Sequence, residues 1–346
     1  MMRAELDGGM HMKRMKLGRS GIEVGAVALG TWGLGGGSVW SDRDSTVEQA
    51  RSLLDACKEY GINYIDTAPV YGTGVSETLL GDALKGRRHD FVMQTKCSLN
   101  WRGEGGNFHY SRDGYTVNND TRPEAIRRDV EDSLRRMQTD YLDVLIVHYV
   151  CKGFPLEDTV GALEDLVAEG KIRAYGLSNS QPDDLHAYET AAAAKQGASV
   201  VQEFFSILSP FHGREYFPVC RAHNAVFQTY GVLEEGFLTS PEFMEKRFAK
   251  TDIRARIPWV DPACHGALKE AFRLWEPLTE RYNCSFAALV EAWALAQFEN
   301  MSLLVGMRRP ETVADTVRCL DIHLTADELA AMERAVASIQ VAVLDK

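Results

Sequence analysis

Residues 121–148, TRPEAIRRDVEDSLRRMQTDYLDVLIVH, contain a helix pattern that is followed at once by a strand pattern. The helix pattern has an apolar stripe at helical spacing, made of Ile126, Val130, Leu134 and Met137. Its Arg and Glu residues are best interpreted as the solvated face of that helix. The strand pattern is the short apolar run from Val144 to His148. A helix that leads into a buried strand is the repeating unit of a parallel sheet with crossover helices.

The same alternation of strand and helix patterns continues from about residue 26 to about residue 320. Eight strands are expected, at Ala26 to Leu29, Tyr64 to Asp66, Phe91 to Lys96, Val144 to His148, Ala174 to Ser178, Val200 to Phe204, Ala225 to Tyr230 and Ser302 to Gly306. Eight strand-helix units favour an α/β fold of the (β/α)8 TIM barrel type over an open doubly wound sheet. We therefore predict a single barrel domain over residues 1–346, with the barrel at 26–320 and a C-terminal helix and tail at 321–346.

Three segments do not fit this repeat. Residues 13–25 are expected to form a β-hairpin around a turn at Gly18 to Gly21, which plugs the N-terminal mouth of the barrel. Residues 97–120 are rich in Gly and Asn and too long for a simple connection, so we predict a covering loop at the C-terminal rim. Residues 231–265 form a second long excursion, after the seventh strand.

Local signals predict where several helices begin and end. Capping boxes are expected at Ser45 to Glu48 and at Thr121 to Glu124, where a Ser or Thr precedes a Glu by three residues. Pro182 stands where a proline is tolerated in the first turn of a helix. Gly61 and Gly170 are expected to end helices.

The chain has 38 Lys and Arg residues against 49 Asp and Glu residues, which gives a formal net charge of −11. An acidic surface repels phosphate backbones, and this argues against a nucleic-acid partner. The seven cysteines are scattered without a C-x-x-C pair, so neither a metal site nor a disulfide framework is expected. No window approaches roughly eighteen uninterrupted apolar residues, and the start lacks the apolar core of a signal peptide. We expect a cytoplasmic protein that does not enter the membrane.

Polar side chains gather where the predicted strands end. They are Asp66, Lys96, His148, Ser178, Asn179, Gln202 and Tyr230. The C-terminal rim of a barrel is where its active site is built, so these residues are expected to converge in one pocket. An unpaired ammonium is costly in a low-dielectric interior, and Asp66 is the obvious partner for Lys96. Polar groups at a rim also serve simply to solvate it, but Asp66, Lys96 and His148 together favour a functional site.

Four segments, in order along the chain, share a further property. They are GINYIDTAPVYGTGVSETLLG (61–81), LRRMQTDYLD (134–143) leading to His148, GKIRAYGLSN (170–179) and GMRRPE (306–311). Together they resemble the sequence signatures of the aldo-keto reductase family, and the resemblance extends over about residues 13 to 338. It implies a barrel enzyme that reduces carbonyl compounds with a nicotinamide cofactor.

The resemblance also implies roles for four residues. Tyr71 would be the general acid, and Lys96, paired with Asp66, would lower the pKa of this tyrosine. His148 would orient the substrate carbonyl. An unperturbed Tyr titrates at about 10 and a nearby ammonium favours the phenolate, so these roles are chemically reasonable. From position alone, Tyr71 is otherwise a hydrogen-bonded loop aromatic and His148 a satisfied histidine at a strand end.

The cofactor that the resemblance implies is NADPH (NADP+). The nicotinamide carboxamide is assigned to side chains whose donors and acceptors match it, namely Ser178, Asn179 and Gln202. Phe205 stands where many family members have a Tyr that stacks on the nicotinamide ring. The remaining cofactor contacts that are implied, apart from the 2′-phosphate, are Thr31, Trp32, Tyr230, Val232, Leu233 and Gly306.

The adenosine 2′-phosphate is assigned to Arg308 and Arg309, whose guanidinium groups are charge-assisted donors. A solvated helix N-terminus is the alternative for this pair. The adjoining contacts depart from the family pattern, because Thr312, Asp315 and Thr316 stand where relatives often have Gln or Arg, Glu and Asn.

We therefore expect an NADPH-dependent oxidoreductase that reduces an aldehyde, a ketone or a sugar-like carbonyl, or oxidises the corresponding alcohol. A cofactor-binding regulatory subunit with little turnover remains the alternative, since some barrels that resemble this family have that role. Substrate choice is expected to lie chiefly in residues 97–120 and 231–265, with a further contribution from the tail after Ala337. An apolar wall is expected from Trp32, Trp40, Trp101 and Phe108.

Overall fold

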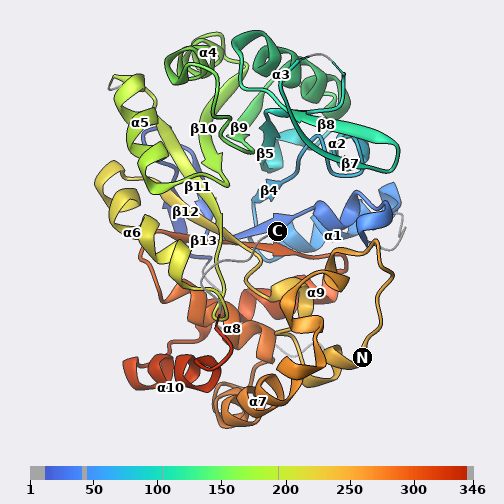
Figure 1. Cartoon of the computed structure of the whole chain (residues 1–346), viewed down its shortest axis with the longest axis vertical. Coiled ribbons are helices and arrows are strands. Elements are labelled where there is room, and N and C mark those ends of the chain that lie inside the picture. Colours follow the sequence, from blue (N-terminus) through green and yellow to red (C-terminus); the bar gives the residue numbers. More distant parts are fainter. Residues whose placement is uncertain (1–11, 41–44, 104, 194, 341–346) are drawn as a thin grey trace.

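The computed structural model describes residues 12–40, 45–103, 105–193 and 195–340. Eight parallel strands close into a barrel in the order β10-β11-β12-β13-β3-β4-β5-β9 (Figure 1). Their bounds are β3 Val27–Gly30, β4 Tyr64–Asp66, β5 Val92–Cys97, β9 Leu142–Val147, β10 Ile172–Ser178, β11 Ala198–Phe204, β12 Val226–Tyr230 and β13 Met301–Gly306. All eight predicted strands are confirmed, with ends that differ from the prediction by no more than two residues.

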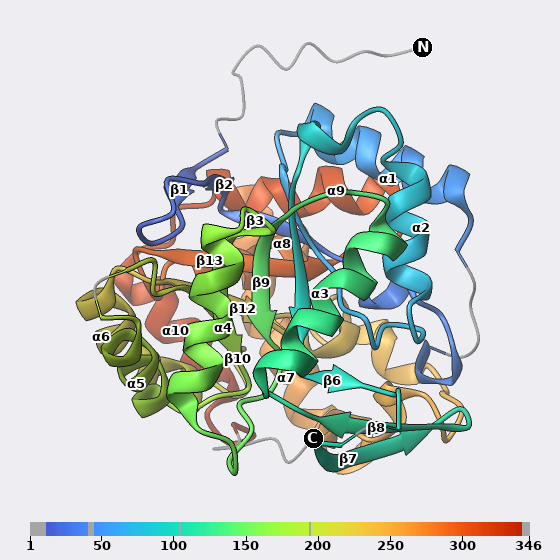
Figure 2. The same cartoon turned by 90° about the horizontal axis from the view of Figure 1, so that it is seen from above.

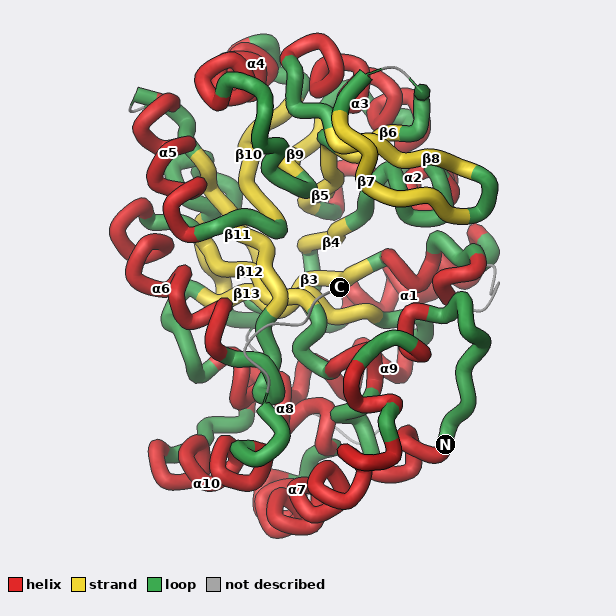
Figure 3. Tube along the Cα trace, in the orientation of Figure 1, coloured by secondary structure: helices red, strands yellow, loops and turns green. Residues whose placement is uncertain are grey.

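Helices form the outer layer around these strands (Figure 3). Their bounds are α1 Val47–Glu59, α2 Val75–Ala83, α3 Pro123–Met137, α4 Leu156–Ala168, α5 Pro182–Ala192, α6 Phe211–His223, α7 Pro262–Tyr282, α8 Phe286–Leu295, α9 Pro310–Thr316 and α10 Ala326–Val336. The predicted (β/α)8 barrel is confirmed. Among the described residues, no helix is long and apolar enough to cross a membrane. The division of the chain into a single domain over 1–346 stays a prediction, because residues 1–11 and 341–346 lie outside the described residues.

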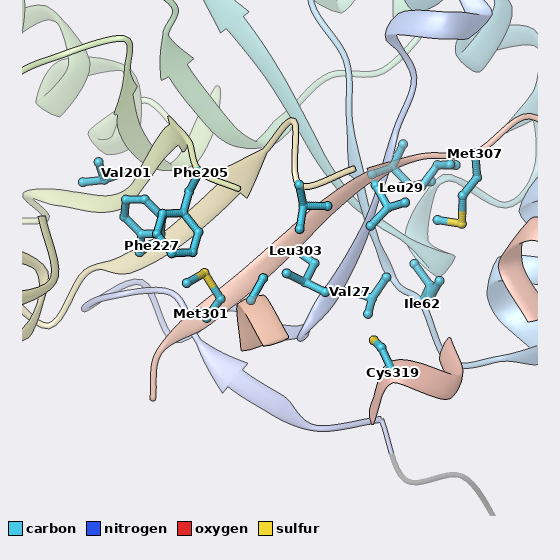
Figure 4. Close-up of a cluster of buried hydrophobic side chains, with 14 of the residues drawn as sticks. Val27, Leu29, Ile62, Val201, Phe205, Phe227, Met301, Leu303, Met307 and Cys319 are labelled. Atoms are coloured by element: carbon cyan, nitrogen blue, oxygen red, sulfur yellow. The ribbon is translucent and has the colours of Figure 1, made fainter. Parts of the chain in front are cut away.

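Side chains along each barrel strand alternate between the lumen and the surrounding helices. Val27 and Leu29 of β3 belong to the large apolar core between strands and helices, whereas Ala28 packs in a second cluster inside the barrel. Figure 4 shows part of the outer core, with Leu29, Leu303 and Phe227 from three strands. The alternation follows from the pleat of a strand, which points successive side chains to opposite faces. One residue in two along each strand therefore lines the lumen.

The lumen is apolar at the N-terminal ends of the strands and polar at their C-terminal ends. The apolar cluster inside the barrel includes Tyr64, Val92, Val144, Val200 and Val226. Two residues further along four of these strands lie Asp66, Gln94, Gln202 and Gln228, which are all buried. The pleat thus carries each strand from an apolar to a polar lumen position in one step of two residues.

The N-terminal hairpin closes the apolar end of the lumen, as predicted. Strands β1 Arg14–Lys16 and β2 Glu23–Gly25 pair antiparallel. Leu17, Ile22 and Val24 of the hairpin pack in the same cluster as the lumen valines. The hairpin thus keeps water from the lower barrel and leaves the polar end as the accessible one.

Residues 97–120 are not the irregular loop that we expected. They contain a three-stranded antiparallel sheet in the order β6-β8-β7, with β6 Leu99–Asn100, β7 Asn107–Arg112 and β8 Tyr115–Asn119. This sheet, which we call the rim sheet, follows β5 and lies at the opposite end of the barrel from the hairpin (Figure 2). The strand pairing satisfies backbone groups that an irregular loop would leave to solvent. Residues 231–265 are built differently, from short 3-10 helices at 234–236, 241–245, 253–255 and 258–260 that lead into α7.

Two predicted helix starts are wrong in detail. The capping box of α1 is formed by Thr46 and Gln49, one residue later than predicted. At α3 the residues Thr121 to Glu124 form no capping box, because Arg122 is the N-cap and makes no side-chain cap. The carboxylate of Asp120 instead accepts the backbone N–H of Arg122 at 3.1 Å. The other predicted helix limits are confirmed, at Gly61, Gly170 and Pro182.

Candidate active site

Asp66 and Lys96 form a buried ion pair at the C-terminal end of the lumen. Asp66 ends β4, and Lys96 is the second-last residue of the neighbouring strand β5. Lys96 Nζ lies 2.7 Å from each carboxylate oxygen of Asp66, and both side chains are 1% exposed. Lys96 also donates to the main-chain oxygen of Thr67 at 2.8 Å. These partners compensate a charge that would otherwise be costly to bury.

The turn after β4 holds Tyr71 over this ion pair. Lys96 Nζ lies 3.2 Å from the Tyr71 hydroxyl and donates to it. The turn packs backbone to backbone against the loop after β3, where a Cβ on Gly72 would overlap the main-chain oxygen of Gly35. Gly72 also has a φ of +63°, which favours glycine. The position of Tyr71 therefore depends on close contact between two βα loops.

His148 reaches the same point from the end of β9. Its imidazole lies edge to face with the Tyr71 ring, with centroids 6.2 Å apart. Trp32 stacks on Tyr71 at 6.0 Å, and Tyr149 lies 5.4 Å from His148. His148 Nδ1 is buried and makes no hydrogen bond with a described residue. The four side chains predicted as catalytic, Asp66, Tyr71, Lys96 and His148, are thus brought together.

Burial raises the pKa of Tyr71 well above its ordinary value, and the Asp66 carboxylate acts in the same direction. The net shift is upward because burial is its largest cause, and Asp66 balances much of the charge of Lys96 at 2.7 Å. That Lys96 by itself lowers this pKa stays a prediction. Tyr71 is therefore held as a neutral phenol, the form that can donate a proton.

Burial lowers the pKa of His148 well below its ordinary value, and the positive charge of Lys96 adds to this effect. The imidazole is therefore neutral near pH 7. Burial also lowers the pKa of Lys96, while the carboxylate of Asp66 opposes that shift. The site thus combines a neutral phenol and a neutral imidazole with one internally compensated ion pair.

Both the fold and the sequence match known proteins. The model of the Aldo/keto reductase family matches residues 26–337. This chain belongs to the aldo/keto reductase family. It is 35% identical over 321 residues to the NADH-specific methylglyoxal reductase of Escherichia coli (strain K12), across 91% of this chain and 95% of that protein. It is 30% identical over 304 residues to the aldo-keto reductase YhdN of Bacillus subtilis (strain 168), across 86% of each chain.

Among solved structures, this aldo/keto reductase is similar to a glycerol dehydrogenase from Gluconobacter oxydans. The TM-score is 0.83 and the identity 29%, across 96% of this chain and 97% of that one. Members of the family use NAD(P)H, and the chain is accordingly an oxidoreductase that acts on carbonyl compounds.

Three of the predicted cofactor residues meet beside His148. Asn179 follows β10 with a φ of +50°, and its Nδ2 donates to the main-chain oxygen of His148 at 2.9 Å. The hydroxyl of Tyr230, at the end of β12, donates to Asn179 Oδ1 at 2.7 Å. Ser178 Oγ accepts from Asn179 Nδ2 at 3.1 Å. Tyr230 as a residue is partly exposed.

Phe205 does not lie at the rim of this aldo/keto reductase. Its ring is fully buried in the outer core, stacked on Trp293 at 5.4 Å and against Phe227 at 6.0 Å (Figure 4). The prediction that Phe205 stacks on a nicotinamide is therefore wrong. Thr31 is also fully buried, and its hydroxyl donates to the main-chain oxygen of Asp66 at 2.8 Å. The side chain of Thr31 joins two strand ends instead of facing a cofactor.

The residues assigned to the adenosine phosphate begin α9. Arg309 is the N-cap of this helix and is exposed. The aliphatic part of Arg308 lies against the loop after β3, where a Cβ on Gly33 would be 3.4 Å from Arg308 Cδ. The two arginines thus lie directly before α9, and Arg308 is beside the loop after β3.

The next turn of α9 faces the protein interior. The carboxylate of Asp315 accepts from the Ser285 hydroxyl at 2.7 Å. Thr316 is buried, and its hydroxyl donates to Glu291 Oε1 at 3.4 Å. These contacts contradict the predicted cofactor roles of both side chains. The other predicted cofactor residues differ in exposure. Val232 is buried, whereas Trp32, Leu233, Gly306 and Thr312 are partly or fully exposed.

The predicted apolar wall is confirmed only in part. Trp32 and Trp40 lie edge to face at 5.1 Å beside Tyr71. Trp101 packs against Arg136 at 5.6 Å, and Phe108 is 69% exposed, so neither is placed beside Tyr71 by a ring contact.

Four side chains at the site were not predicted from the sequence. On the far side of His148 the wall is formed by Tyr149 and by His109 of the rim sheet, whose rings are 4.4 Å apart. Tyr149 directly follows His148 in sequence, which is the one local signal available. Below the ion pair, the missed residues are Gln94 and Gln228.

Proposed function

We propose that this aldo/keto reductase reduces a small aldehyde, ketone or sugar-like carbonyl with NADPH and oxidises the corresponding alcohol in the reverse direction. The observation that carries the proposal is the chain of contacts from Asp66 through Lys96 to the Tyr71 hydroxyl, with donor-acceptor distances of 2.7 and 3.2 Å. It ends on a neutral phenol beside a neutral imidazole, which are two hydrogen-bond donors at one point of the rim.

The residues along the rim fit a nicotinamide dinucleotide. The side chains of Ser178 and Asn179 match the donors and acceptors of a carboxamide. Gln202, assigned with them from the sequence, already donates both amide protons to Asp66 and Gln228, so only its oxygen remains for that role. With Phe205 buried, we assign the stacking role to the ring of the partly exposed residue Tyr230. When bound, the cofactor supplies a hydride to the substrate carbon.

Tyr71 donates its phenolic proton to the carbonyl oxygen as negative charge develops there. His148, held neutral by burial and by Lys96, gives a second hydrogen bond to the same oxygen and so fixes the direction of the carbonyl. Lys96 keeps its ammonium on the Tyr71 hydroxyl and stabilises the phenolate left after proton transfer. In the oxidative direction the same phenolate takes the proton of the alcohol.

We infer a small, oxygen-rich substrate. Flat aromatic faces beside Tyr71, from Trp32, and beside His148, from Tyr149 with His109, suit the C–H faces of a short polyol or sugar-like chain. Two similar proteins support this size class by their names, a methylglyoxal reductase and a glycerol dehydrogenase.

A panel of carbonyls tests the proposed reaction directly. We expect steady consumption of NADPH with at least one member of a set containing methylglyoxal, glyceraldehyde, dihydroxyacetone, an aldohexose and benzaldehyde, with the short oxygen-rich compounds favoured. Absorbance of the reduced cofactor is the readout. Tight cofactor binding without turnover of any member, together with a partner that copurifies, would instead establish the regulatory-subunit alternative.

Cofactor preference is a separate prediction that concerns Arg308 and Arg309. A charge-assisted hydrogen bond contributes on the order of 1.5 to 3 kcal/mol, so NADPH should bind at least about tenfold tighter than NADH. The variant Arg308→Ala/Arg309→Ala should lose most of this preference and keep its NADH affinity, because NADH has no phosphate there. Fluorescence titration with both cofactors measures the four dissociation constants.

A control for this prediction removes two exposed guanidinium groups elsewhere, in Arg135→Ala/Arg273→Ala, and so makes the same change in net charge. It should leave the preference intact. The Escherichia coli relative is named NADH-specific. Equal constants for the wild type, or tighter binding of NADH, would therefore refute the phosphate site and align this chain with that relative.

A further inference from the structure

Three glutamine side chains meet Asp66 inside the barrel, below the ion pair. Gln94 of β5 is the register partner of Asp66 on β4, and Gln202 of β11 is the partner of Gln228 on β12. In the closed strand order these two pairs of strands lie on opposite sides of the barrel. Each of the four side chains is at most 2% exposed. The four groups therefore meet across the lumen, away from water.

Four hydrogen bonds join these side chains into a closed ring. Gln94 Nε2 donates to Asp66 Oδ1 at 2.6 Å and to Gln228 Oε1 at 2.7 Å. Gln202 Nε2 donates to the same two acceptors, at 3.0 and 2.7 Å. The amide nitrogens of Gln94 and Gln202 thus use both of their protons, and each of the two oxygens accepts two hydrogen bonds of the ring, to which Asp66 Oδ1 adds one from Lys96. We call this arrangement the amide ring.

Chemistry allows only one direction for the amide ring. An ionised carboxylate accepts hydrogen bonds and cannot donate them, so Gln94 and Gln202 must turn their nitrogens toward Asp66. The second proton of each of these amides then needs an acceptor, and the oxygen of Gln228 is that acceptor. The hydroxyl of Tyr64 donates to Gln94 Oε1 and so favours the same orientation of Gln94 from the other side. The arrangement is thus matched to Asp66 in its charged form.

We propose that Gln94 and Gln228 are positioning residues for the reaction. Through the amide ring they keep the Asp66 carboxylate aimed at Lys96, and thereby keep the Lys96 ammonium on the Tyr71 hydroxyl. The inference rests on the proposed function, because it concerns how the proton donor of that reaction is held. Gln94 acts directly on Asp66, and Gln228 acts through Gln94 and Gln202.

Stability alone does not explain a polar layer at this level of the barrel. Branched apolar residues dominate the interior of such barrels, and they fill the lumen just below, with Val92, Val144 and Val200. A buried polar network adds little net stability over a well-packed apolar layer of the same volume. The network is found beside Asp66, where a carboxylate without enough donors is most costly.

The charged and titratable groups around Asp66 come from several elements. They are Lys96 of β5, Tyr64 of β4, Tyr71 in the turn after β4, Glu77 of α2, whose charge acts on Lys96, and His148 after β9, on which the charge of Lys96 acts. Lys96 is the one cation of this group while His148 is neutral. The amide N–H groups of Gln94 and Gln202 are therefore the other hydrogen-bond donors that stabilise the Asp66 carboxylate.

Replacing Gln94 by Met tests the inference, because Met keeps the unbranched shape and removes both donors. We expect kcat of Gln94→Met for carbonyl reduction to fall at least about tenfold, the effect of one hydrogen bond to a charged group, with KM for substrate and cofactor within about threefold of wild type. The rising limb of the pH profile for alcohol oxidation should move to higher pH, because a displaced Lys96 ammonium stabilises the Tyr71 phenolate less.

Gln228 makes no direct hydrogen bond with Asp66. The second variant, Gln228→Met, should therefore lower kcat less, by about three- to tenfold. In the double variant kcat should fall by no more than about twofold beyond Gln94→Met, because both residues act through the same carboxylate. If the two substitutions acted as independent packing defects, their fold-reductions in kcat would multiply instead.

Ser302→Ala is the matched control within the same layer. Ser302 is the register partner of Gln228 and fully buried, and its hydroxyl makes no hydrogen bond with a described residue. This variant should keep kcat within about twofold and leave the pH profile unchanged.

A crystal structure of Gln94→Met gives a readout that needs no activity. We expect the Asp66 carboxylate to rotate and Lys96 Nζ to withdraw from its 3.2 Å contact with the Tyr71 hydroxyl. Unchanged geometry, or an unchanged kcat and pH profile in folded variants, would overturn the inference. If Gln94→Met does not fold, the same measurements on Gln228→Met decide the question. Failure of the wild type to turn over any carbonyl would overturn the proposed function, and the crystal structure would still decide the role of the amide ring.

Discussion

Tyr71→Phe should lower kcat for carbonyl reduction by about 10² to 10⁴-fold, the usual contribution of a general acid. The change removes the one proton that the proposed mechanism delivers to the carbonyl oxygen. It should leave folding and cofactor binding nearly unchanged, because the ring contacts with Trp32 and His148 remain. Among the described residues the hydroxyl has a single hydrogen-bond partner, Lys96 at 3.2 Å. Steady-state kinetics and cofactor fluorescence titration measure the two effects.

Tyr60→Phe is a matched control, since Tyr60 is the C-cap of α1 and so lies toward the N-terminal ends of the strands. It removes a phenol hydroxyl far from the rim and should keep wild-type turnover. If Tyr71→Phe retained more than about a third of wild-type turnover, another group would have to be the acid.

Lys96→Met should depress kcat strongly, on the order of 10²-fold or more, since it affects the same proton transfer. It removes the ammonium from Tyr71 and leaves the negative charge of Asp66 nearby, so the phenolate becomes still less favourable. The pKa of Tyr71, already raised by burial and by Asp66, should rise further. Alcohol oxidation needs the phenolate and therefore increases as pH rises through this pKa, so the rising limb of its pH profile should move to higher pH. The pH profile of oxidation is the measurement.

Lys96→Met also leaves an uncompensated carboxylate in the barrel, a change that typically costs about 3 to 5 kcal/mol of stability. The double variant Lys96→Met/Asp66→Asn removes that charge and should recover thermal stability without recovering turnover. A raised KM with normal kcat and an unchanged pH profile would contradict the mechanism and make Lys96 a substrate-binding residue.

Much of this protein is determined by local sequence. The strands were predictable because each strand-helix unit buries its own short apolar run, as in residues 121–148. The convergence of Asp66, Lys96 and His148 was also predictable, since parallel strands of a barrel bring their carboxyl ends to one rim. The hairpin at 13–25 followed from its turn glycines and short length. The mechanistic roles and the cofactor preference remain predictions that the variants above test.

Tertiary structure decided the remaining features. Phe205 lies one residue beyond β11, and only the packing of Trp293 and Phe227 shows that its ring belongs to the core. The net upward shift in the pKa of Tyr71 was not predictable from the sequence, because it depends on burial and on the Asp66 charge beside Lys96. The amide ring has the same origin. Its members come from strands on opposite sides of a closed barrel, and a hydrogen bond of less than 3 Å across a lumen exists only once the closure and register of all eight strands are set.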